Sequence, residues 1–464
     1  MTISGPGRLR TGGILAYAAP AFAFAMPTLP IYIYLPALYA DKLGLGLALT
    51  GAVMLAARCF DAVTDPVAGL LSDRTRSRYG ARKPWILGGS VIAAIGLIML
   101  VFPFVEPGAF YLLIALVVLY SGWSAVMVPY TAWAAELSED YDERARITAW
   151  REAAGLVGIL AAALIPVAVL AQGGDEAGGL QAVALVAVAT GAVGLVAMAR
   201  MTPNATSVIA ERSSGFDVKR SVALLRRNKP FLRLATGWFV NGLANGIPAA
   251  LFLLYLEYAL AADGTTRGLF ILVYFLCAVA AMPLWTRLSS AYGKHRAWCF
   301  AMILACAAFV CVPWIGPGGF VAFFIVCAIT GAALGADLSL PPALQADVVD
   351  FHRLRSPTRD TGLFFAAWNL ITKIALAVAA GAALVGVDLL GFDPKAPDDD
   401  GRLALVIVYA LVPVALKLGA IALIWGFPID RRRQALIARR LRSERSGGER
   451  ASEVLQAEER PVGV

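Results

Sequence analysis

Two short stretches of this chain resemble each other, and they decide how the chain is divided. Residues 78–85 read RYGARKPW, and residues 291–298 read AYGKHRAW. Each stretch follows a proline inside an apolar segment, Pro66 in the first case and Pro283 in the second. Each also places basic residues and a tryptophan at the start of the next apolar segment. An internal repeat with this spacing predicts that the chain consists of two related halves.

The composition is that of a membrane protein. Of the 464 residues, 59% are hydrophobic and only 16% are charged, whereas soluble proteins average roughly 45–50% apolar and about 25% charged residues. Apolar runs of at least about 18 residues, the length that a helix needs to cross a bilayer, recur twelve times. They lie at residues 12–40, 46–72, 84–104, 109–135, 150–172, 180–200, 230–260, 266–288, 297–314, 319–345, 361–390 and 403–427. The sequence therefore predicts an all-α membrane protein with twelve transmembrane helices.

The distribution of Lys and Arg among the loops predicts the orientation. Positive residues are concentrated in alternate loops, while the opposite loops hold few. Because positive residues resist translocation, we expect the basic loops and both termini to be cytoplasmic, in a multi-pass protein of the cell (inner) membrane. The twelve helices, the repeat and a basic central linker together resemble the major facilitator superfamily, which implies two pseudo-symmetric six-helix bundles. The bundles are then residues 1–200 and 230–428, with a cytoplasmic linker at 201–229 and a partly disordered cytoplasmic tail at 429–464.

Several classes of protein are disfavoured by what the sequence lacks. It has no GxxxxGK[ST] phosphate-binding loop, its six cysteines show no CxxC spacing, and its only two histidines lie in predicted loops. We therefore expect no enzyme, no cofactor and no structural metal. The net charge of +8 follows from the loop asymmetry, so no nucleic-acid partner is expected. We expect a monomer whose first apolar segment is retained as a helix, and whose partners are the lipid bilayer and a small solute.

Three charged residues lie inside the second apolar segment. Arg58, Asp61 and Asp65 share one helical face, and each costs about 2.5–3.5 kcal/mol at mid-bilayer. Two carboxylates four residues apart repel each other, so either one holds a proton or a cation lies between them. Pro66 also frees the carbonyl oxygen of Ala62 near these carboxylates. The sequence predicts a site for a coupling ion, and the alternative is a buried Arg–Asp pair that only fixes helix packing.

Three longer stretches indicate a family. Residues 58–85, 128–151 and 346–373 resemble segments of the glycoside-pentoside-hexuronide:cation symporters, and the likeness extends over nearly the whole chain in order. The resemblance implies alternating-access symport of a solute with Na⁺, H⁺ or Li⁺. It implies a cation site that is made by Asp61, Thr64, Asp65 and Ser124. It also implies that Lys373 lies near cation and solute, and that Arg151 binds the solute. Physically, Lys373 needs an inward carboxylate partner, and the pair on the second helix is the obvious candidate.

The sugar-binding positions of that family are altered here. The two carboxylates that would accept hydrogen bonds from a galactoside fall at Ala25 and Met127, and the nearby aromatic position falls at Thr131. A sugar, glycoside or uronide remains favoured because most of the family transports such compounds. The family is also similar to animal sodium-coupled lysophospholipid symporters, so a lysolipid-like amphiphile is the alternative. A non-transporting membrane sensor on the same scaffold is the other alternative.

Other polar residues in the apolar segments are candidates for the solute site. Asn241 and Asn245 lie on one face before Pro248, a pattern suited to a broken helix that lines a cavity, or to plain hydrogen bonding between helices. Asp337 is an isolated acid that either lines the transport path or pairs with a basic residue. Trp368 and Asn369 lie within about a turn and a half of Lys373 and offer a stacking face and an amide, although packing is an alternative for Trp368.

Charges of both signs lie at matching cytoplasmic ends of the two halves. Such a pattern suits a gate of salt bridges that closes the inner side while the outer side is open, or simply solvated loops. The predicted members are Asp73, Arg74, Arg78, Arg144, Asp347, Asp350 and Arg359.

Overall fold

The structure is a computed structural model of the whole chain. It describes residues 11–28, 30–75, 77–137, 141–203, 218–354, 361–430, 433–434, 436–437 and 440. The predicted tail therefore lies largely outside the described residues, as does much of the predicted linker.

Within the described residues, twelve helices are long and apolar enough to cross a membrane, which agrees with the twelve predicted segments. The first consists of α1 (Thr11–Ala25), a π-helical turn (Pro30–Tyr34), α2 (Leu35–Ala37) and a second π-helical turn (Leu38–Lys42). The next five are α3 (Leu47–Arg74), α4 (Lys83–Val101), α5 (Ala109–Glu136), α6 (Tyr141–Ala171) and α7 (Glu176–Met201). The short helix α8 (Val218–Arg227) lies within the predicted linker. The described residues contain no β-strand.

The second half follows the same plan. It consists of α9 (Lys229–Leu254) with a π-helical turn (Tyr255–Ala259), α10 (Gly264–Tyr292), α11 (Lys294–Val310) with a 3₁₀ turn (Val312–Trp314), α12 (Phe320–Arg353) and α13 (Thr361–Leu389). The last span comprises α14 (Asp399–Val406), a π-helical turn (Ile407–Leu411) and α15 (Val412–Ile424). Of the two alternatives for Asn241 and Asn245, the broken helix is not found, because α9 runs through Pro248 without interruption. Neighbouring helices can support the backbone around a proline in a membrane helix.

The repeated stretches share a glycine conformation but lie in connections of different length, because α3 ends at Arg74 and α4 begins at Lys83, whereas only Gly293 separates α10 from α11. Gly80 and Gly293 both have positive φ angles, 86° and 91°, which glycine adopts without the steric cost of a side chain. The lysines that follow them fix the start of the next helix to a neighbour. Lys83 Nζ donates to the carbonyl oxygen of Thr202 at 2.8 Å, and Lys294 Nζ contacts Asp347 Oδ2 at 2.7 Å. The repeat therefore shares a glycine with a positive φ angle and a lysine that bonds to a neighbouring segment in each half.

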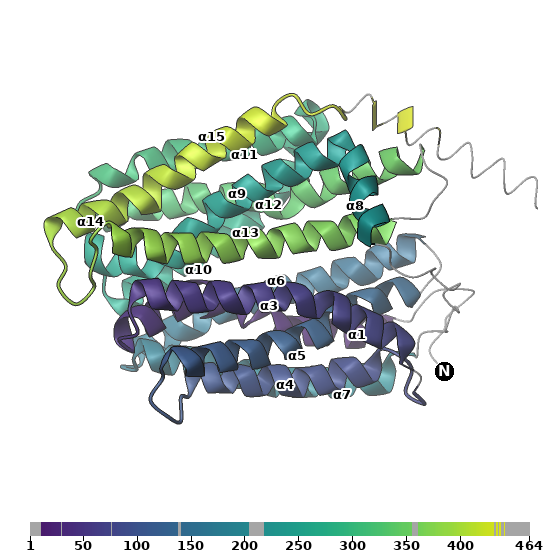
Figure 1. Cartoon of the computed structure of the whole chain (residues 1–464), viewed down its shortest axis with the longest axis horizontal. Helices are drawn as coiled ribbons and strands as arrows, with labels where there is room; N and C mark the ends of the chain where they lie inside the picture. The colour runs from purple at the N-terminus through teal and green to yellow at the C-terminus, as the bar shows by residue number, and fades with distance from the viewer. Residues whose placement is uncertain are drawn as a thin grey trace, which may run out of the picture.

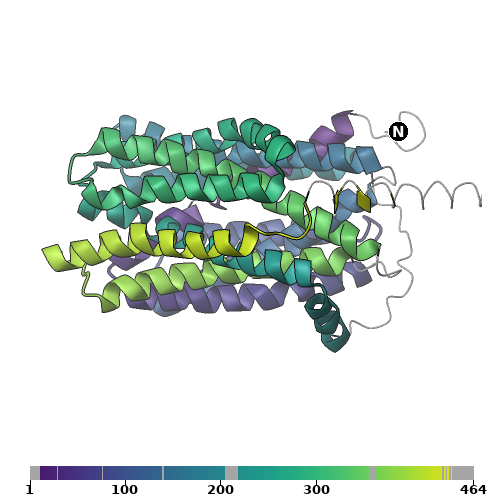
Figure 2. The same ribbon diagram turned by 90° about the horizontal axis from the view of Figure 1, so that it is seen from above.

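The helices form two bundles. Figure 1 shows α1 and α3–α7 in one layer and α9–α15 in the other, here called the N-terminal and C-terminal bundles. Both figures place α8 and the N-terminal side of the chain at the same end of the long axis, here called the linker end (Figures 1 and 2). The opposite end, where α3 and α10 begin, is called the far end.

The apolar cores show where the two bundles meet. One large cluster contains residues of both bundles, such as Tyr34 and Tyr39 from the first span together with Tyr255, Phe392 and Tyr409. The linker end instead holds one cluster in the C-terminal bundle and a separate one in the N-terminal bundle. Among the described residues, the apolar contact between the bundles is thus made toward the far end.

Glycines bring the bundles close at the far end. A Cβ atom on Gly51 of α3 would lie 3.2 Å from the carbonyl oxygen of Gly381 on α13. On the other side, a Cβ atom on Gly268 of α10 would lie 2.7 Å from Val167 Cγ2 on α6. Such distances are shorter than ordinary packing, so small residues permit this close approach.

Candidate functional site

Helix α3 positions the central acidic residue of the site. Asp61 is only 1% exposed, and both of its carboxylate oxygens have partners. Oδ1 accepts from Lys373 Nζ at 2.9 Å and from Ser124 Oγ at 3.2 Å, while Oδ2 accepts from an Arg58 nitrogen at 3.4 Å. A carboxylate is tolerated inside an apolar bundle when it is paired and hydrogen-bonded in this way.

Lys373 joins the two bundles at this site. It lies on α13 of the C-terminal bundle, and its ammonium group contacts Asp65 Oδ2 at 2.7 Å as well as Asp61 Oδ1 at 2.9 Å. The prediction that Lys373 has its partners on the second helix is confirmed. The charge of one side chain therefore lies between two carboxylates, in the position where the sequence predicts a proton or a cation.

The oxygen atoms around Asp61 suit a hard cation. Thr64 Oγ1 donates to the carbonyl oxygen of Asp61 at 2.9 Å and lies 2.9 Å from Ser124 Oγ. Asp65 Oδ1 is buried without a hydrogen-bond partner in the described part of the chain. Carboxylate and hydroxyl oxygens are ligands that hard cations prefer, and either carboxylate can accept a proton. The four residues of the predicted cation site therefore lie together with one oxygen unused.

Arg58 separates this site from the far end. Its guanidinium group lies between the rings of Tyr32 and Tyr120, 4.6 and 4.3 Å from their centroids. Beside it is a cavity of about 20 Å³, lined from both bundles by residues that include Ala249 on α9 and Ala377 on α13. A cavity of this size holds about one water molecule. In contrast to Asp61, the side chains of Asp65 and Lys373 are 25% and 20% exposed, and they lie on the linker-end side of Arg58.

A second polar cluster lies in the C-terminal bundle. Asn245 Nδ2 donates to Asp337 Oδ2 at 2.8 Å, and Lys417 on α15 donates to the amide oxygens of Asn241 and Asn245 at 2.9 and 2.8 Å. Trp298 Nε1 donates to Asp337 Oδ1 at 2.5 Å. The structure therefore joins three predicted residues to two that sequence reasoning missed. Lys417 had a clear signal, because a lysine inside an apolar segment is as costly as the acids of α3.

Two of the other predicted residues make different contacts from those expected of a solute site. Trp368 is 5% exposed and stacks on Trp238, with ring centroids 4.9 Å apart and an interplanar angle of 12°. In this conformation Trp368 therefore has the packing role that the sequence analysis gave as the alternative. Arg151 bonds to the adjacent Glu152, and its guanidinium carbon lies 6.0 Å from the ring centroid of Tyr130.

Asn369 is exposed on α13. Roles in solute binding for Arg151, Trp368 and Asn369 stay predictions.

The predicted cytoplasmic gate is only partly described. Arg78 lies over the ring of Tyr79, 4.7 Å from its centroid, and Asp347 pairs with Lys294 inside the C-terminal bundle. The other members are exposed or half-buried, namely Arg74 and Asp350, or have side chains outside the described part, namely Asp73, Arg144 and Arg359. A gate that forms when the far end opens is not expected in this conformation, so it stays a prediction.

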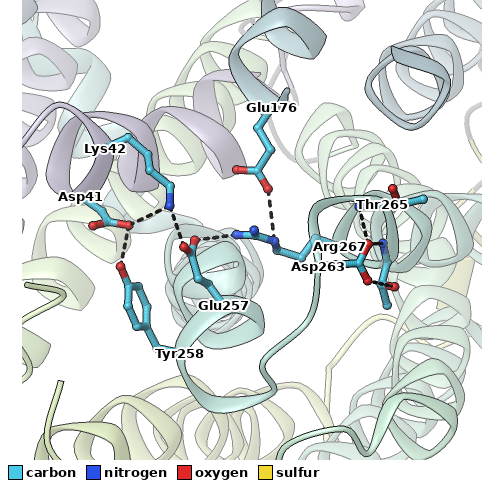
Figure 3. A network of polar contacts seen from close by, with 9 residues as sticks. Asp41, Lys42, Glu176, Glu257, Tyr258, Asp263, Thr265 and Arg267 are labelled. Carbon is cyan, nitrogen blue, oxygen red and sulfur yellow. Dashed lines mark hydrogen bonds and ion pairs between the residues drawn. The ribbon is translucent and has the colours of Figure 1, made fainter. Parts of the chain in front are cut away.

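A network of ion pairs closes the far end instead (Figure 3). Lys42 at the end of the first span contacts Glu257 Oε1 at 2.6 Å. The other oxygen of Glu257 accepts from Arg267 at 2.5 Å, and Arg267 Nε lies 3.1 Å from Glu176 Oε1 at the start of α7. The chain of alternating charges thus runs from the N-terminal bundle to the C-terminal bundle and back. The sequence placed Lys42 and Arg267 among the few basic residues of these loops, but it did not predict that they meet.

Two further carboxylates support this end. Tyr258 OH donates to Asp41 Oδ2 at 2.7 Å, which adds another contact between the bundles (Figure 3). Asp263 caps α10 by accepting hydrogen bonds from the hydroxyl of Thr266 and from the backbone N–H groups of Thr265 and Thr266. These bonds lower the pKa of Asp263, with the Thr266 hydroxyl contributing most.

The arrangement agrees with comparisons to known proteins. A family model described as MFS/sugar transport protein matches residues 16–431, which is most of the chain. The chain belongs to this transporter family. Relatives of this transporter include the glucuronide carrier protein homolog of Escherichia coli (strain K12), which is 24% identical over 91% of this chain and 92% of its own length. The human sodium-dependent lysophosphatidylcholine symporter 1 is 23% identical over 82% of this chain and 77% of its own length.

Solved structures show the same fold. A D-xylose-proton symporter has a TM-score of 0.64 and 12% sequence identity, and the match covers 90% of this transporter and 96% of that chain. The nucleoside transporter NupG has a TM-score of 0.62, also at 12% identity, with coverage of 89% and 99%. At this identity the likeness establishes the fold, two six-helix bundles of the major facilitator type, which confirms the predicted fold class.

We expect the far-end network to control the closed conformation of this transporter. Replacing Glu257 with glutamine removes the negative charge between Lys42 and Arg267. The population of the conformation with a closed far end should therefore fall a few-fold. The measurement is the rate at which a maleimide labels Ala249→Cys in a cysteine-free background, because Ala249 lines the small cavity beside Arg58. We expect labelling about three- to tenfold faster.

The matched control is Asp399→Asn, because the side chain of Asp399 is 99% exposed at the same end and, among the described residues, pairs only with Arg402 within the first turn of α14. Equal labelling rates in Glu257→Gln and Asp399→Asn would show that the network does not hold the far end closed.

Proposed function

We propose that this protein is a secondary active symporter that couples the movement of a small organic solute to a cation by alternating access. The solute class that we favour is a sugar, glycoside or uronide, and the coupling ion is Na⁺ or H⁺, with Li⁺ as a further candidate. The observation that carries the proposal is the position of Lys373 between Asp61 and Asp65. A tethered positive charge at this point is what a mobile cation would replace.

The proposed coupling follows from charge balance. In the conformation described, two positive groups, the ammonium of Lys373 and the guanidinium of Arg58, balance the two carboxylates of the predicted cation site. When Na⁺ or a proton binds at Asp61 and Asp65, Lys373 loses its electrostatic partners and becomes available to polar groups of the solute. Because Lys373 belongs to the opposite bundle, this exchange changes the contact between the bundles and thus biases which end is open.

The orientation that we propose places the linker end in the cytoplasm. The loops at that end carry most of the Lys and Arg residues, and such loops resist translocation. The far-end network would then close the protein on the outer side of the cell membrane, and both termini would lie in the cytoplasm. The exposure of Asp65 and Lys373 on the linker-end side of Arg58 fits a state open to the cytoplasm. We propose that the protein works as a monomer.

The decisive experiment is transport in proteoliposomes with an imposed ion gradient. A radiolabelled panel of free sugars, glycosides and uronates should give accumulation of at least one compound under an inward Na⁺ or H⁺ gradient, and none without a gradient. Binding that occurs without any gradient effect on uptake would favour the sensor alternative and would contradict the proposal.

One observation favours an amphiphile as a second candidate solute. A largely apolar pocket of about 190 Å³ lies among α1, α4, α5 and α7 of the N-terminal bundle and is partly open to the outside of the bundle; the residues that line it include Phe24, Trp123 and Met127. It exceeds the cavity of about 150 Å³ that holds benzene in an engineered protein. Met127 occupies a position where the glycoside-pentoside-hexuronide:cation symporters that this chain resembles have a sugar-binding carboxylate. Competition of uptake by lysophosphatidylcholine, with no effect of glycosides, would select this alternative.

A further inference from the structure

The ammonium group of Lys417 fixes the orientation of two amide side chains. It is 5% exposed, and it lies 2.9 Å from Asn241 Oδ1 and 2.8 Å from Asn245 Oδ1. An ammonium group can only donate hydrogen bonds, so it must face the oxygen of each amide. The NH₂ groups of Asn241 and Asn245 are therefore directed away from Lys417.

Asp337 fixes one of these amides from its other side. Its Oδ2 atom accepts from Asn245 Nδ2 at 2.8 Å, and its Oδ1 atom accepts from Trp298 Nε1. A carboxylate can only accept, so Asn245 cannot reverse its amide without losing both neighbours. Lys417 Nζ lies 3.9 Å from Asp337 Oδ2, so the charges of these two residues also compensate each other.

The amide of Asn245 keeps hydrogen-bonding capacity after these contacts. An amide oxygen has two lone pairs and an amide NH₂ group has two N–H bonds, and these contacts use one of each. Lys417 Nζ and Asp337 Oδ2 are only 3.9 Å apart, so they bond to the adjacent outer edge of the amide, and the donor and the acceptor that remain are directed to opposite sides of it. Asn241 Nδ2 is a further buried donor with no partner in the described part of the chain.

Asn245 lies next to residues of α9 that line the small cavity between the bundles. It is half-buried, unlike Asn241, and Ala249 on the same helix face lines the small cavity beside Arg58. Asn245 is one helical turn closer to the linker end than Ala249. Lys373 has the corresponding place on α13, one turn from Ala377, which lines the same cavity.

We infer that Lys417 and Asp337 are positioning residues, and that they hold the Asn245 amide to bind two hydroxyl groups of the solute, one on each side of the amide. One hydroxyl accepts from the remaining N–H, and the other donates to the remaining lone pair of Oδ1. This pairing selects a polyhydroxylated solute over an amphiphile with an acyl chain. The buried pair is not needed for packing alone, because apolar residues of similar volume fill such space at least as well. The inference rests on the proposed symport function and specifies its solute class.

The test measures binding to purified full-length protein by thermal shift and isothermal titration. The hydroxylated probes are methyl β-D-glucuronide and methyl β-D-xyloside, the amphiphilic probe is lysophosphatidylcholine, and Na⁺ and pH responses are recorded separately. Wild type should bind at least one hydroxylated probe. Lys417→Met, which removes the donors and the charge but keeps a similar shape, should weaken that binding by about tenfold, while its Na⁺ or pH response stays as in wild type.

Matched variants separate positioning from folding. Lys417→Arg keeps the charge and the donors and should retain more affinity than Lys417→Met. The double variant Lys417→Met/Asp337→Asn leaves no uncompensated charge, so it should fold even where a single variant does not. It should bind the hydroxylated probe more weakly than wild type. Lys395→Met, in the far-end loop that follows α13, should bind like wild type.

Two results would overturn the inference. The first is unchanged affinity for the hydroxylated probe in folded Lys417→Met or in the double variant. The second is wild-type protein that responds to Na⁺ or pH but binds no hydroxylated probe, whether or not it binds lysophosphatidylcholine. This second result would leave the proposed cation coupling intact. Hydroxylated-probe binding with no response to Na⁺ or pH would instead contradict the proposed cation coupling.

Discussion

Replacing Asp65 with asparagine is expected to abolish cation-driven accumulation of the solute while the protein remains folded and inserted. Asp65 supplies one carboxylate of the proposed cation site, including the buried oxygen Oδ1 that has no partner in the described part of the chain. Removing one charge from a close, partly buried ion site reduces affinity by about a hundredfold or more. The protein tolerates this change because Asp65 is 25% exposed and Lys373 retains Asp61. The measurement is solute accumulation in proteoliposomes under a Na⁺ or H⁺ gradient.

Two comparisons make the Asp65 result interpretable. Asp399→Asn removes a carboxylate that is 99% exposed and should leave accumulation unchanged. Asp61→Asn should damage the protein more, because Asp61 is 1% exposed and bonds to Arg58, Ser124 and Lys373 at once. Accumulation by Asp65→Asn within about twofold of wild type would rule out Asp65 as a ligand of the coupling ion.

Replacing Lys373 with methionine is expected to tighten cation binding and to stop net transport. The ammonium group occupies the space next to Asp61 Oδ1 and Asp65 Oδ2, the same atoms that the coupling ion would use. Without this competing charge, two carboxylates face each other, and they attract a proton or Na⁺ more strongly. We expect the affinity for the ion to rise by about ten- to hundredfold. The ion then leaves slowly, so the cycle stalls.

Equilibrium binding of ²²Na⁺ and its pH dependence measure this effect directly. If the ion is Na⁺, the apparent Kd falls in Lys373→Met. If the ion is H⁺, the variant takes up its proton at a higher pH than wild type. Lys395→Met serves as the control because Lys395 lies in a far-end loop, away from both acids. Weaker ion binding in Lys373→Met would mean that the lysine supports the site and does not compete for it.

The two charged clusters are connected by aromatic side chains. Trp298, which bonds to Asp337, lies 6.2 Å from Trp238 between ring centroids. Trp238 in turn donates through Nε1 to Thr372 Oγ1 at 2.7 Å, one residue before Lys373. The packing of α9, α11 and α13 therefore relates the position of Lys373 to the polar cluster around Asn245. Because Lys417→Met leaves Lys373 and the carboxylates of α3 in place, its response to Na⁺ or pH is expected to stay as in wild type.

The sequence by itself determined the features that depend on local chemistry. Twelve apolar segments of sufficient length must cross the membrane as helices, because a bilayer offers no other partner for the backbone. The same reasoning shows that Arg58, Asp61 and Asp65 require partners, since unpaired charges are costly in hydrocarbon. The repeated stretches at residues 78–85 and 291–298 also predict two related halves, and both stretches contain a glycine with positive φ.

Only the tertiary structure decided which residues meet. Lys373 lies 312 residues from Asp61 in sequence, and Lys417 lies 176 residues from Asn241. Nor did the sequence predict that Glu257 would join Lys42 to Arg267, or that Trp368 would stack on Trp238. The physical reason is that side-chain pairing depends on how helices are rotated and shifted against one another. That geometry is set by packing over whole helix faces, and no short stretch of sequence encodes it.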